Sequence, residues 1–239
     1  MLTLRLETLR LNDATRVLDL GCGRGRHLHA AYAKGNIHAV GLDLSEEDIM
    51  ATKEGFAPFL KSPPPGATHS LISGDALRLP FADASFDVII CSEVLEHIED
   101  YQSVLKEIAR VAAPGARIGI SVPRGWPERI CWTLAPKYPA PASVGGHVRI
   151  FKADVLKNAV VAEGFDYRGK HYAHGLHSPY WWLRCAFWES QDDNWAVRQY
   201  QKFLEWDIMK RPLLTRVLEA IADPLMGKSV AMYFEKPAP

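Results

Sequence analysis

The sequence predicts an α/β protein built on a doubly wound, mainly parallel sheet. Short runs of β-branched and aliphatic residues alternate five times with helical patterns between residues 16 and 122. The connections are long enough for a crossover helix that returns the chain parallel to the previous strand. The first run, residues 16–20, leads through Gly21, Gly23 and Gly25 directly into a helical pattern. Such a unit of strand, glycine turn and helix brings backbone N–H groups close to a ligand.

The composition limits the class of protein. Of the 239 residues 48% are hydrophobic, and 28 basic residues balance 28 acidic ones, which suits one elaborated domain and disfavours a nucleic-acid partner. The four cysteines are far apart and form no Cys-x-x-Cys pair, as expected in a reducing cytoplasm and not in a disulfide framework or zinc site. The sequence has no signal-peptide pattern and no apolar run of about 18 residues, so we expect a soluble, cytoplasmic protein.

The order of elements follows from apolar periodicity and from glycine and proline stops. Strands are expected at residues 16–20, 37–42, 68–72, 86–91, 117–122, 165–172 and 229–234. Helices are expected at residues 1–12, 26–34, 100–113, 153–163, 194–209 and 213–222, and after Ser45, which forms a capping box with Asp48. The first of these helices carries Leu2, Leu6 and Leu9 on one face and would pack on the sheet edge or cover a pocket. Residues 123–146, rich in proline and glycine, are expected to form a long loop.

The glycine turn does not fit a dinucleotide. A dinucleotide fingerprint needs glycine or alanine three residues after its second glycine, where this chain has the bulky Arg26. Asp19 precedes the first glycine by two residues, and a carboxylate there repels a pyrophosphate but attracts a cationic amino group. These residues resemble the first motif of the class I S-adenosylmethionine-dependent methyltransferases, which has the same order of one acid and three glycines. Their cofactor carries an ammonium and a sulfonium group.

The resemblance implies a Rossmann-like site for S-adenosylmethionine at the carboxyl ends of the first four strands, with S-adenosylhomocysteine as the product. The amino group of the cofactor would lie on the backbone of Ser92. The rest of its methionine part would lie against Asp19, Gly21, Cys22, Gly23 and Gly25.

The second and third strands supply the expected nucleoside contacts. Asp43 follows the glycines by about 20 residues and would accept both ribose hydroxyls, with Leu44 beside it; alternatively, Asp43 only caps its loop. The resemblance further implies that Asp75 accepts a hydrogen bond from the adenine amino group and that the Ala76 N–H meets the ring. The alternative is that Gly74 and Asp75 only form a turn.

The turn after the fourth strand would face the methyl end of the cofactor. An oxygen acceptor needs its proton removed, and His97 is the best-placed candidate base, with Glu93 as the carboxylate candidate. His97 could instead order the turn or contact the cofactor, and Glu96 could be a base or a solvated helix-cap residue. The sequence from Ser92 to Leu95 lacks the Pro-Pro-aromatic motif of some methyltransferases that act on amino nitrogens, which disfavours that class.

The second half of the chain differs from the first half in composition. Every tryptophan lies between Trp126 and Trp206. The resemblance implies a seventh, antiparallel strand directly after the sixth, but some fifty residues intervene. We therefore expect a seven-stranded Rossmann-like domain formed by residues 1–172 and 228–239, with residues 173–227 inserted as a helical, aromatic-rich lid that is not an independent domain.

The lid supplies the candidate acceptor contacts. His171, His174 and His177 are spaced i, i+3, i+6 along a strand end and loop, which does not place three imidazoles at one point, and no acid or cysteine lies among them. We therefore expect no metal there and a role in the substrate pocket instead. Tyr180 and Trp181 could line an apolar or sugar-like acceptor, although most lid aromatics would form the core of the lid. Arginines beside these aromatics also allow transient contact with a membrane surface.

The expected function is methyl transfer from S-adenosylmethionine to a small molecule. The motifs resemble the small-molecule methyltransferases related to ubiquinone and menaquinone biosynthesis, and an oxygen on a glycan, isoprenoid or lipid-linked acceptor is the expected target. One alternative is a methyltransferase-like binding protein without turnover, against which the intact Asp19, Asp43 and Asp75 speak. The other is a methyltransferase for protein or RNA, which the neutral charge and the apolar lid disfavour.

Overall fold

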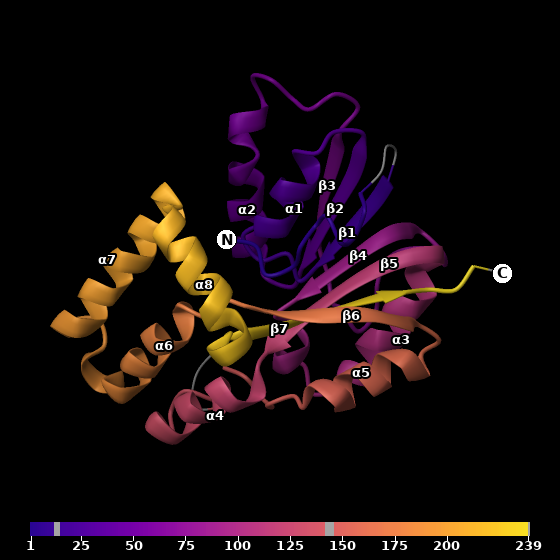
Figure 1. The fold of residues 1–239 in the computed structure, drawn as a ribbon. Helices are drawn as coiled ribbons and strands as arrows, with labels where there is room; N and C mark the ends of the chain where they lie inside the picture. Colours follow the sequence, from indigo (N-terminus) through magenta and orange to yellow (C-terminus); the bar gives the residue numbers. More distant parts are fainter. Residues whose placement is uncertain (12–14, 142–145, 239) are drawn as a thin grey trace.

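The computed structural model describes residues 1–11, 15–141 and 146–238, and it contains a seven-stranded sheet in the order β3-β2-β1-β4-β5-β7-β6 (Figure 1). The first five strands are parallel, and β7 is antiparallel to both of its neighbours, β5 and β6. The expected sheet and its antiparallel last strand are therefore confirmed. The strands are β1 (Thr15–Leu20), β2 (Ile37–Asp43), β3 (Thr68–Ser73), β4 (Phe86–Ser92), β5 (Ala112–Pro123), β6 (Asp166–Ala173) and β7 (Ser229–Glu235).

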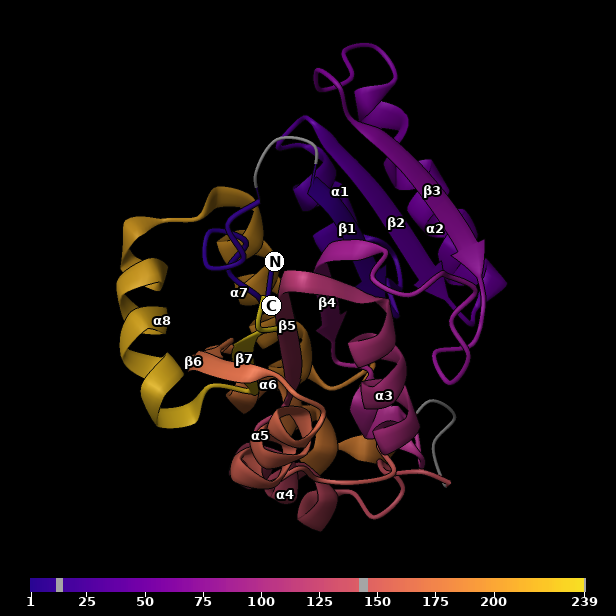
Figure 2. The same cartoon turned by 90° about the vertical axis from the view of Figure 1, so that its right-hand side faces the viewer.

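Helices cover both faces of the sheet (Figures 1 and 2). Ser45 caps the second helix as expected, because its hydroxyl accepts the Asp48 N–H at 3.2 Å. Three short 3₁₀ turns are η1 (Ala57–Phe59), η2 (Leu95–His97) and η3 (Trp188–Ser190). The α-helices are α1 (Arg26–Tyr32), α2 (Glu46–Gly55), α3 (Tyr101–Val111), α4 (Gly125–Leu134), α5 (Ala153–Ala162), α6 (His177–Ala186), α7 (Trp195–Lys210) and α8 (Leu213–Met226).

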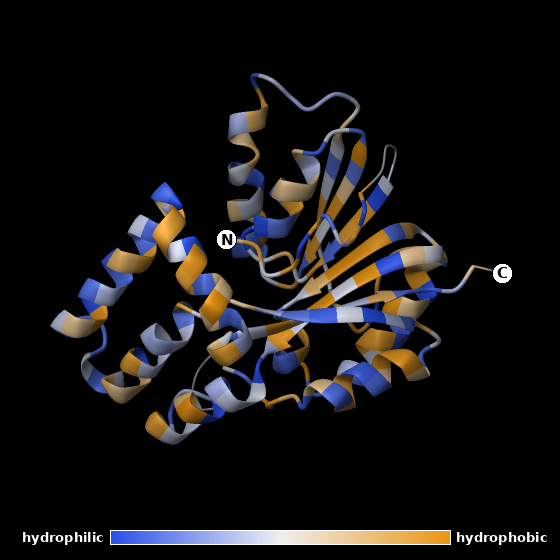
Figure 3. Ribbon diagram, in the orientation of Figure 1, coloured by the Kyte–Doolittle hydropathy of each residue, from blue (hydrophilic) through white to orange (hydrophobic). Residues whose placement is uncertain are grey.

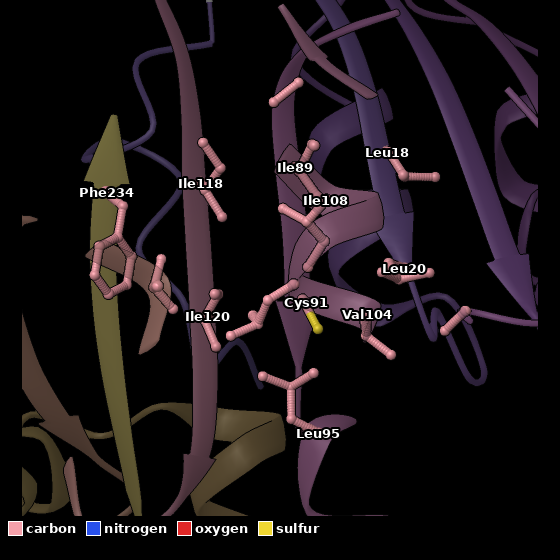
Figure 4. Close-up of a cluster of buried hydrophobic side chains, with 14 of the residues drawn as sticks. Leu18, Leu20, Ile89, Cys91, Leu95, Val104, Ile108, Ile118, Ile120 and Phe234 are labelled. Carbon is pink, nitrogen blue, oxygen red and sulfur yellow. The ribbon is translucent and has the colours of Figure 1, made fainter. Parts of the chain in front are cut away.

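The core divides between the two faces, because successive residues of a strand point to opposite sides. On one face, Leu18 and Leu20 of β1 pack with the apolar stripe of α3, which includes Val104 and Ile108 (Figure 4). On the other face, Val17 packs with α1 and with three leucines of the N-terminal segment. The central strands are thus buried on both sides.

The N-terminal segment differs from the expected helix. Residues 1–11 form turns, and residues 12–14 lie outside the described part of the chain. The Nε2 atom of His27 accepts the N–H groups of both Thr3 and Leu4 at 3.2 Å, and the Tyr233 hydroxyl accepts that of Arg5 at 2.7 Å. Side chains of the domain therefore replace the bonds that a helix would make, and the segment lies flat on the sheet.

Two expected loops contain helices. Helix α4 lies within residues 123–146, of which residues 142–145 are outside the description, and α6 begins at His177. Each helix has a proline at its third residue, Pro127 and Pro179. Proline is tolerated in the first turn of a helix because the N–H groups there have no intrahelical acceptor. A proline-containing stretch was therefore the beginning of a helix in both cases.

Helices α6, α7 and α8, which lie in the segment called the lid (residues 173–227), extend from the β6–β7 edge of the sheet (Figure 1). Cys131 of α4 and Cys185 of α6 form a small core with surrounding tryptophans, so α4 packs against the lid. Apolar residues lie along α7 and α8 (Figure 3), and many of their side chains are exposed. Among the described residues, no helix is long and apolar enough to cross a membrane.

Candidate functional site

The glycine turn joins the carboxyl end of β1 to the start of α1. A Cβ atom on Gly21 would lie 2.3 Å from Cγ2 of Val94, so no other residue fits there without a shift. A Cβ atom on Gly23 would meet no atom within 4 Å in the described part of the chain, although its φ of +50° is positive. The backbone of Gly23 therefore faces open space, and a ligand can approach it closely.

Asp19 lies beneath this turn with one unused oxygen. The side chain is 2% exposed, and no described residue donates a hydrogen bond to its Oδ2 atom. Burial raises the pKa of Asp19 to about 7, although the Leu28 N–H and the Arg26 guanidinium oppose the shift. A buried acceptor without a donor is unfavourable by itself, and it suits a cationic group of a ligand.

Cys22 has no nucleophilic character in this turn. The residue is buried, and burial together with the charges of Asp19 and Asp43 raises the pKa of its thiol to about 12. Its contact with the cofactor stays a prediction.

Asp43 caps the glycine turn, as one of the two alternatives predicted. Its Oδ2 accepts the Gly23 N–H at 2.8 Å and its Oδ1 accepts the Ser45 N–H at 2.9 Å. Each carboxylate oxygen has a second lone pair, so this capping leaves room for the ribose contacts, which stay a prediction. Leu44, 75% exposed, presents an apolar side chain next to this carboxylate.

The end of β3 lies beside Asp43, because the Gly74 N–H donates to the Asp43 carbonyl at 2.9 Å. Asp75 is exposed, and its Oδ1 accepts the Leu77 N–H at 2.9 Å, which is a turn-forming bond. Ala76 is buried. The structure thus brings Asp75 and Ala76 to the same sheet edge as Asp43, and their adenine role stays a prediction.

A chain of hydrogen bonds crosses the carboxyl ends of β4 and β5. Arg26 donates to the Ser92 hydroxyl at 3.3 Å, this hydroxyl bonds that of Ser121 at 2.8 Å, and Ser121 donates to Oε1 of Glu93 at 2.9 Å. Glu93 has a φ of +59°, which is rare for a residue with a side chain, and its N–H donates to the Ser121 carbonyl. Backbone strain at the end of a central strand is a feature of functional sites, and here it fixes the Glu93 carboxylate.

Glu96 is buried, which makes the expectation of a solvated cap residue wrong. It is 0% exposed, both of its carboxylate oxygens lack a partner among the described residues, and burial raises its pKa well above the usual range. The Val148 N–H donates to the Glu96 carbonyl, so the chain around residue 148 covers this turn. That cover comes from about fifty residues away in sequence, and spacing alone does not reveal it.

His97 turns toward the same covering segment. Its Nδ1 lies 3.4 Å from the Gly146 carbonyl, and its ring lies 4.9 Å from that of His147, which in turn contacts Glu128 at 2.6 Å. Ligand atoms of Glu96, His97 and His147 lie within 4.8 Å of one another, a grouping that could hold a metal ion. The structure thus places His97 and Glu93 in different surroundings, and whether either residue acts as a base stays a prediction.

Two neighbouring cavities lie beside the lid candidates, and His174 lines both of them. A cavity of about 320 Å³ is lined by Arg26, Glu93, His174, His177, Trp181 and Lys228, among others. We call it the acceptor cavity. His171 lines a neighbouring cavity of about 590 Å³ instead, where its Nε2 contacts the Thr3 carbonyl and its ring stacks on Tyr233. Tyr180 lines neither cavity, and its hydroxyl lies near Gln201. Three of the five lid candidates, His174, His177 and Trp181, therefore come together.

Several residues of these cavities escaped the sequence reasoning. Arg26 was considered only as an obstacle to a dinucleotide, yet its guanidinium connects the glycine turn to β4. Lys228 directly precedes β7, and Glu219 of α8 approaches the lid histidines. The only available signal for Lys228 and Ser121 was their place at the ends of strands.

Comparisons with known proteins find methyltransferases similar to part of this chain. Residues 18–120 match the family described as a methyltransferase domain. The O-methyltransferase rstn1 of Aspergillus nomiae is 34% identical over 117 residues, which are 49% of this chain and 49% of that protein. The ubiquinone biosynthesis O-methyltransferase of Hahella chejuensis is 36% identical over 115 residues, 44% of this chain and 42% of that protein. The chain thus spans half or less of the length of these curated relatives.

The fold of the whole chain is also found in a solved structure. A SAM-dependent methyltransferase from Methanosarcina mazei superposes with a TM-score of 0.64 at 16% identity, covering 100% of both chains. The matched residues 18–120 contain every candidate cofactor residue. Through this segment, the chain is similar to the methyltransferase domains of S-adenosylmethionine-dependent methyltransferases.

Proposed function

We propose that the protein transfers a methyl group from S-adenosylmethionine to an oxygen atom of a small, lipophilic molecule and releases S-adenosylhomocysteine. The observation that carries the cofactor assignment is the buried Asp19 carboxyl, whose Oδ2 has no partner among the described residues and which lies below the open backbone of Gly23. The cofactor supplies an activated methyl group when it is bound. The residues of the chain have to hold it, orient the acceptor and exclude water.

Each predicted cofactor residue then has a defined task. Asp19 accepts the ammonium group, and the Gly23 backbone lies against the methionine part. Asp43 uses its remaining lone pairs for the ribose hydroxyls, while Leu44 packs on the base next to Asp75 and Ala76. The backbone of Ser92, at the end of β4, is the remaining contact of the amino group.

Glu93 is the stronger of the two candidates for the base. It lines the acceptor cavity, whereas His97 turns toward Gly146. The Ser121 hydroxyl donates to Oε1 and leaves Oε2 free to take the proton of an acceptor hydroxyl. His174 and His177, neutral because burial lowers the pKa of both, line the same cavity as hydrogen-bond partners for the acceptor.

A surface on α7 and α8 supports a lipophilic acceptor. Between residues 208 and 218 the side chains of Ile208, Met209, Leu213, Leu214, Val217 and Leu218 are all at least 41% exposed. The same stretch contains Lys210, Arg211 and Arg216 and no acidic residue. Apolar side chains with basic neighbours suit the interface of an anionic membrane, whereas a second copy of the same surface would oppose like charges. We propose that this surface contacts membranes transiently, and we expect a cytoplasmic protein because four buried, free cysteines suit a reducing compartment.

Labelled cofactor tests the function. The full chain is incubated with methyl-labelled S-adenosylmethionine and a lysate that is separated into lipid, small polar, protein and nucleic-acid fractions. Label in the lipid fraction is the expected result, and label in a glycan acceptor would correct only the acceptor class. Label in the protein or RNA fraction would replace the small-molecule proposal. Binding of S-adenosylhomocysteine without label in any fraction would favour the alternative of a binding protein.

A further inference from the structure

We propose that His174, His177 and Glu219 form a binding site for a divalent transition-metal ion of the zinc type. His174 follows β6, His177 is the first residue of α6, and Glu219 lies on α8. One potential ligand atom from each residue lies within 4.8 Å of those of the other two. The expectation of no metal considered only residues close to the histidines in the chain, whereas Glu219 lies 42 residues beyond His177.

Two atoms in this group are buried without a partner. Nδ1 of His177 and Oε1 of Glu219 make no hydrogen bond to any residue that the structure describes. Buried polar atoms are nearly always satisfied, so two such atoms in one cluster need an explanation. A cation bound between the three side chains would provide a partner for both.

His174 is held in an uncommon conformation at the same point. Its φ is +65°, and its Nε2 lies 3.0 Å from Oγ1 of Thr3 while its Nδ1 lies 3.2 Å from the sulfur of Met1. Coordination exchanges one of these two contacts for the metal. The Met1 contact is weak and its side chain is 37% exposed, so this contact is readily released, and the Thr3 hydroxyl would then orient the ring.

Charges of both signs surround the cluster, and the Met1 amino group is one of the cations. Burial keeps both imidazoles neutral, the form that binds metals, and the buried Asp207 acts electrostatically on both His177 and Glu219. Asp223 adds a second acid, while Arg26, Arg211 and Lys228 oppose it.

Two imidazoles and one carboxylate leave a coordination position open. Such a ligand set suits zinc and its neighbours in the first transition series, and three protein ligands are typical of zinc sites that also bind water or a substrate. His174 and His177 both line the acceptor cavity, so an oxygen of a molecule in that cavity could occupy the open position. Only this last step depends on the proposed function; the metal site itself does not.

Cobalt(II) titration tests the site. The full chain is stripped with a chelator and titrated with Co²⁺, whose visible absorption reports coordination, and zinc content is measured after dialysis. One equivalent is expected for the wild type, with affinity at least about tenfold weaker in Glu219→Gln and His177→Ala. His171→Ala, a neighbouring histidine outside the group, and Glu205→Gln, an exposed acid of α7, are the matched controls and should bind as the wild type does.

Three outcomes would overturn the proposal. They are no binding by the wild type, equal binding by all variants, and loss of the metal in Glu96→Gln but not in Glu219→Gln, which would move the ion to the group at Glu96. Circular dichroism checks that each variant is folded, and Glu219→Gln is close in shape to the native residue. Calorimetry with S-adenosylhomocysteine on the same stripped protein separates this result from the proposed function, because the cofactor residues are not ligands of the metal.

Discussion

The glycine turn and the lid differ in how many of their buried polar atoms have hydrogen-bond partners. At the turn, backbone N–H groups occupy both oxygens of Asp43, and Asp19 is the buried exception. In the lid, His177 and Glu219 have buried atoms without partners in the described structure, and large apolar side chains such as Leu213 and Leu214 are exposed. The turn therefore leaves one buried acceptor oxygen, whereas the lid leaves polar atoms inside without partners in the described structure and apolar side chains outside exposed to solvent.

The largest expected effect concerns the boundary between these regions, where Glu93 faces the lid across the acceptor cavity. Glu93→Gln keeps the shape and the acceptor oxygen for Ser121 but removes the base, so we expect methyl transfer to fall by about 10² to 10⁴. Binding of S-adenosylhomocysteine should change little. His97→Asn is the comparison variant, and steady-state rates are the measurement. If His97→Asn loses the activity and Glu93→Gln keeps it, the two roles are reversed.

A second variant tests the preorganisation of the turn. Asp43→Ala removes two bonds to backbone N–H groups together with the proposed ribose contacts. Hydrogen bonds to charged groups contribute about 1.5–3 kcal/mol each, so affinity for S-adenosylhomocysteine should fall by roughly 100-fold or more. Calorimetry measures the change, with the exposed Glu47→Ala of α2 as the control. Unchanged affinity in the Asp43 variant would remove this residue from the site.

Two buried histidines can also be compared. The Nε2 atom of His27 has hydrogen-bond partners, whereas the Nδ1 atom of His177 has none among the described residues. His27 accepts two N–H groups, and burial lowers its pKa to about 3. The unfolded chain has a histidine pKa of about 6.5 and therefore binds more protons below that value, so stability falls as the pH falls from 6.5 toward 3. At pH 5, this difference between the pKa values of the folded and unfolded states lowers the free energy of unfolding by about 2 kcal/mol.

Urea unfolding at pH 7.5, 6 and 5 measures this contribution. His27→Gln keeps an acceptor atom but cannot be protonated, so its stability should fall less steeply with acid than that of the wild type. The other buried histidines act equally in both proteins and cancel in the difference. Parallel stability curves would show that His27 is not the group responsible.

The exposed surface of the lid gives a smaller effect. Leu214→Glu places a charge in the centre of the apolar stripe, and loss of one buried leucine weakens binding to anionic phospholipid vesicles by about 1.5 kcal/mol or more, roughly tenfold. Leu60→Glu, an equally exposed leucine beyond α2, should bind as the wild type does. Vesicle sedimentation is the measurement. Equal binding of Leu214→Glu and the wild type would exclude this surface as a membrane contact.

The two regions also differ in how far the sequence predicts them. The turn, the strands and the acids at their ends depend on residues close together in the chain, so apolar periodicity and glycine spacing were sufficient. Glu96 was misjudged because its cover, near Val148, is distant in sequence, and α4 was missed because Pro127 resembled a loop residue. Glu219 reaches His177 only after α8 folds back on β6, and no local pattern encodes such a contact.

The last comparison concerns Asp19, the acid of the turn whose buried Oδ2 atom has no hydrogen-bond partner among the described residues. Its pKa is raised to about 7 by burial, so part of the free protein carries a proton on this carboxyl at neutral pH. An ammonium group bound beside it favours the ionised form, so binding releases that proton, and affinity for S-adenosylhomocysteine should be about tenfold weaker at pH 6 than at pH 8. Calorimetry in buffers of different ionisation enthalpy counts the released protons, and Asp19→Asn should bind more weakly with a flatter pH profile. A wild-type affinity that does not change between pH 6 and 8 would mean that the cation of the ligand lies elsewhere, and the turn would then lose the feature that distinguishes it from a phosphate-binding loop.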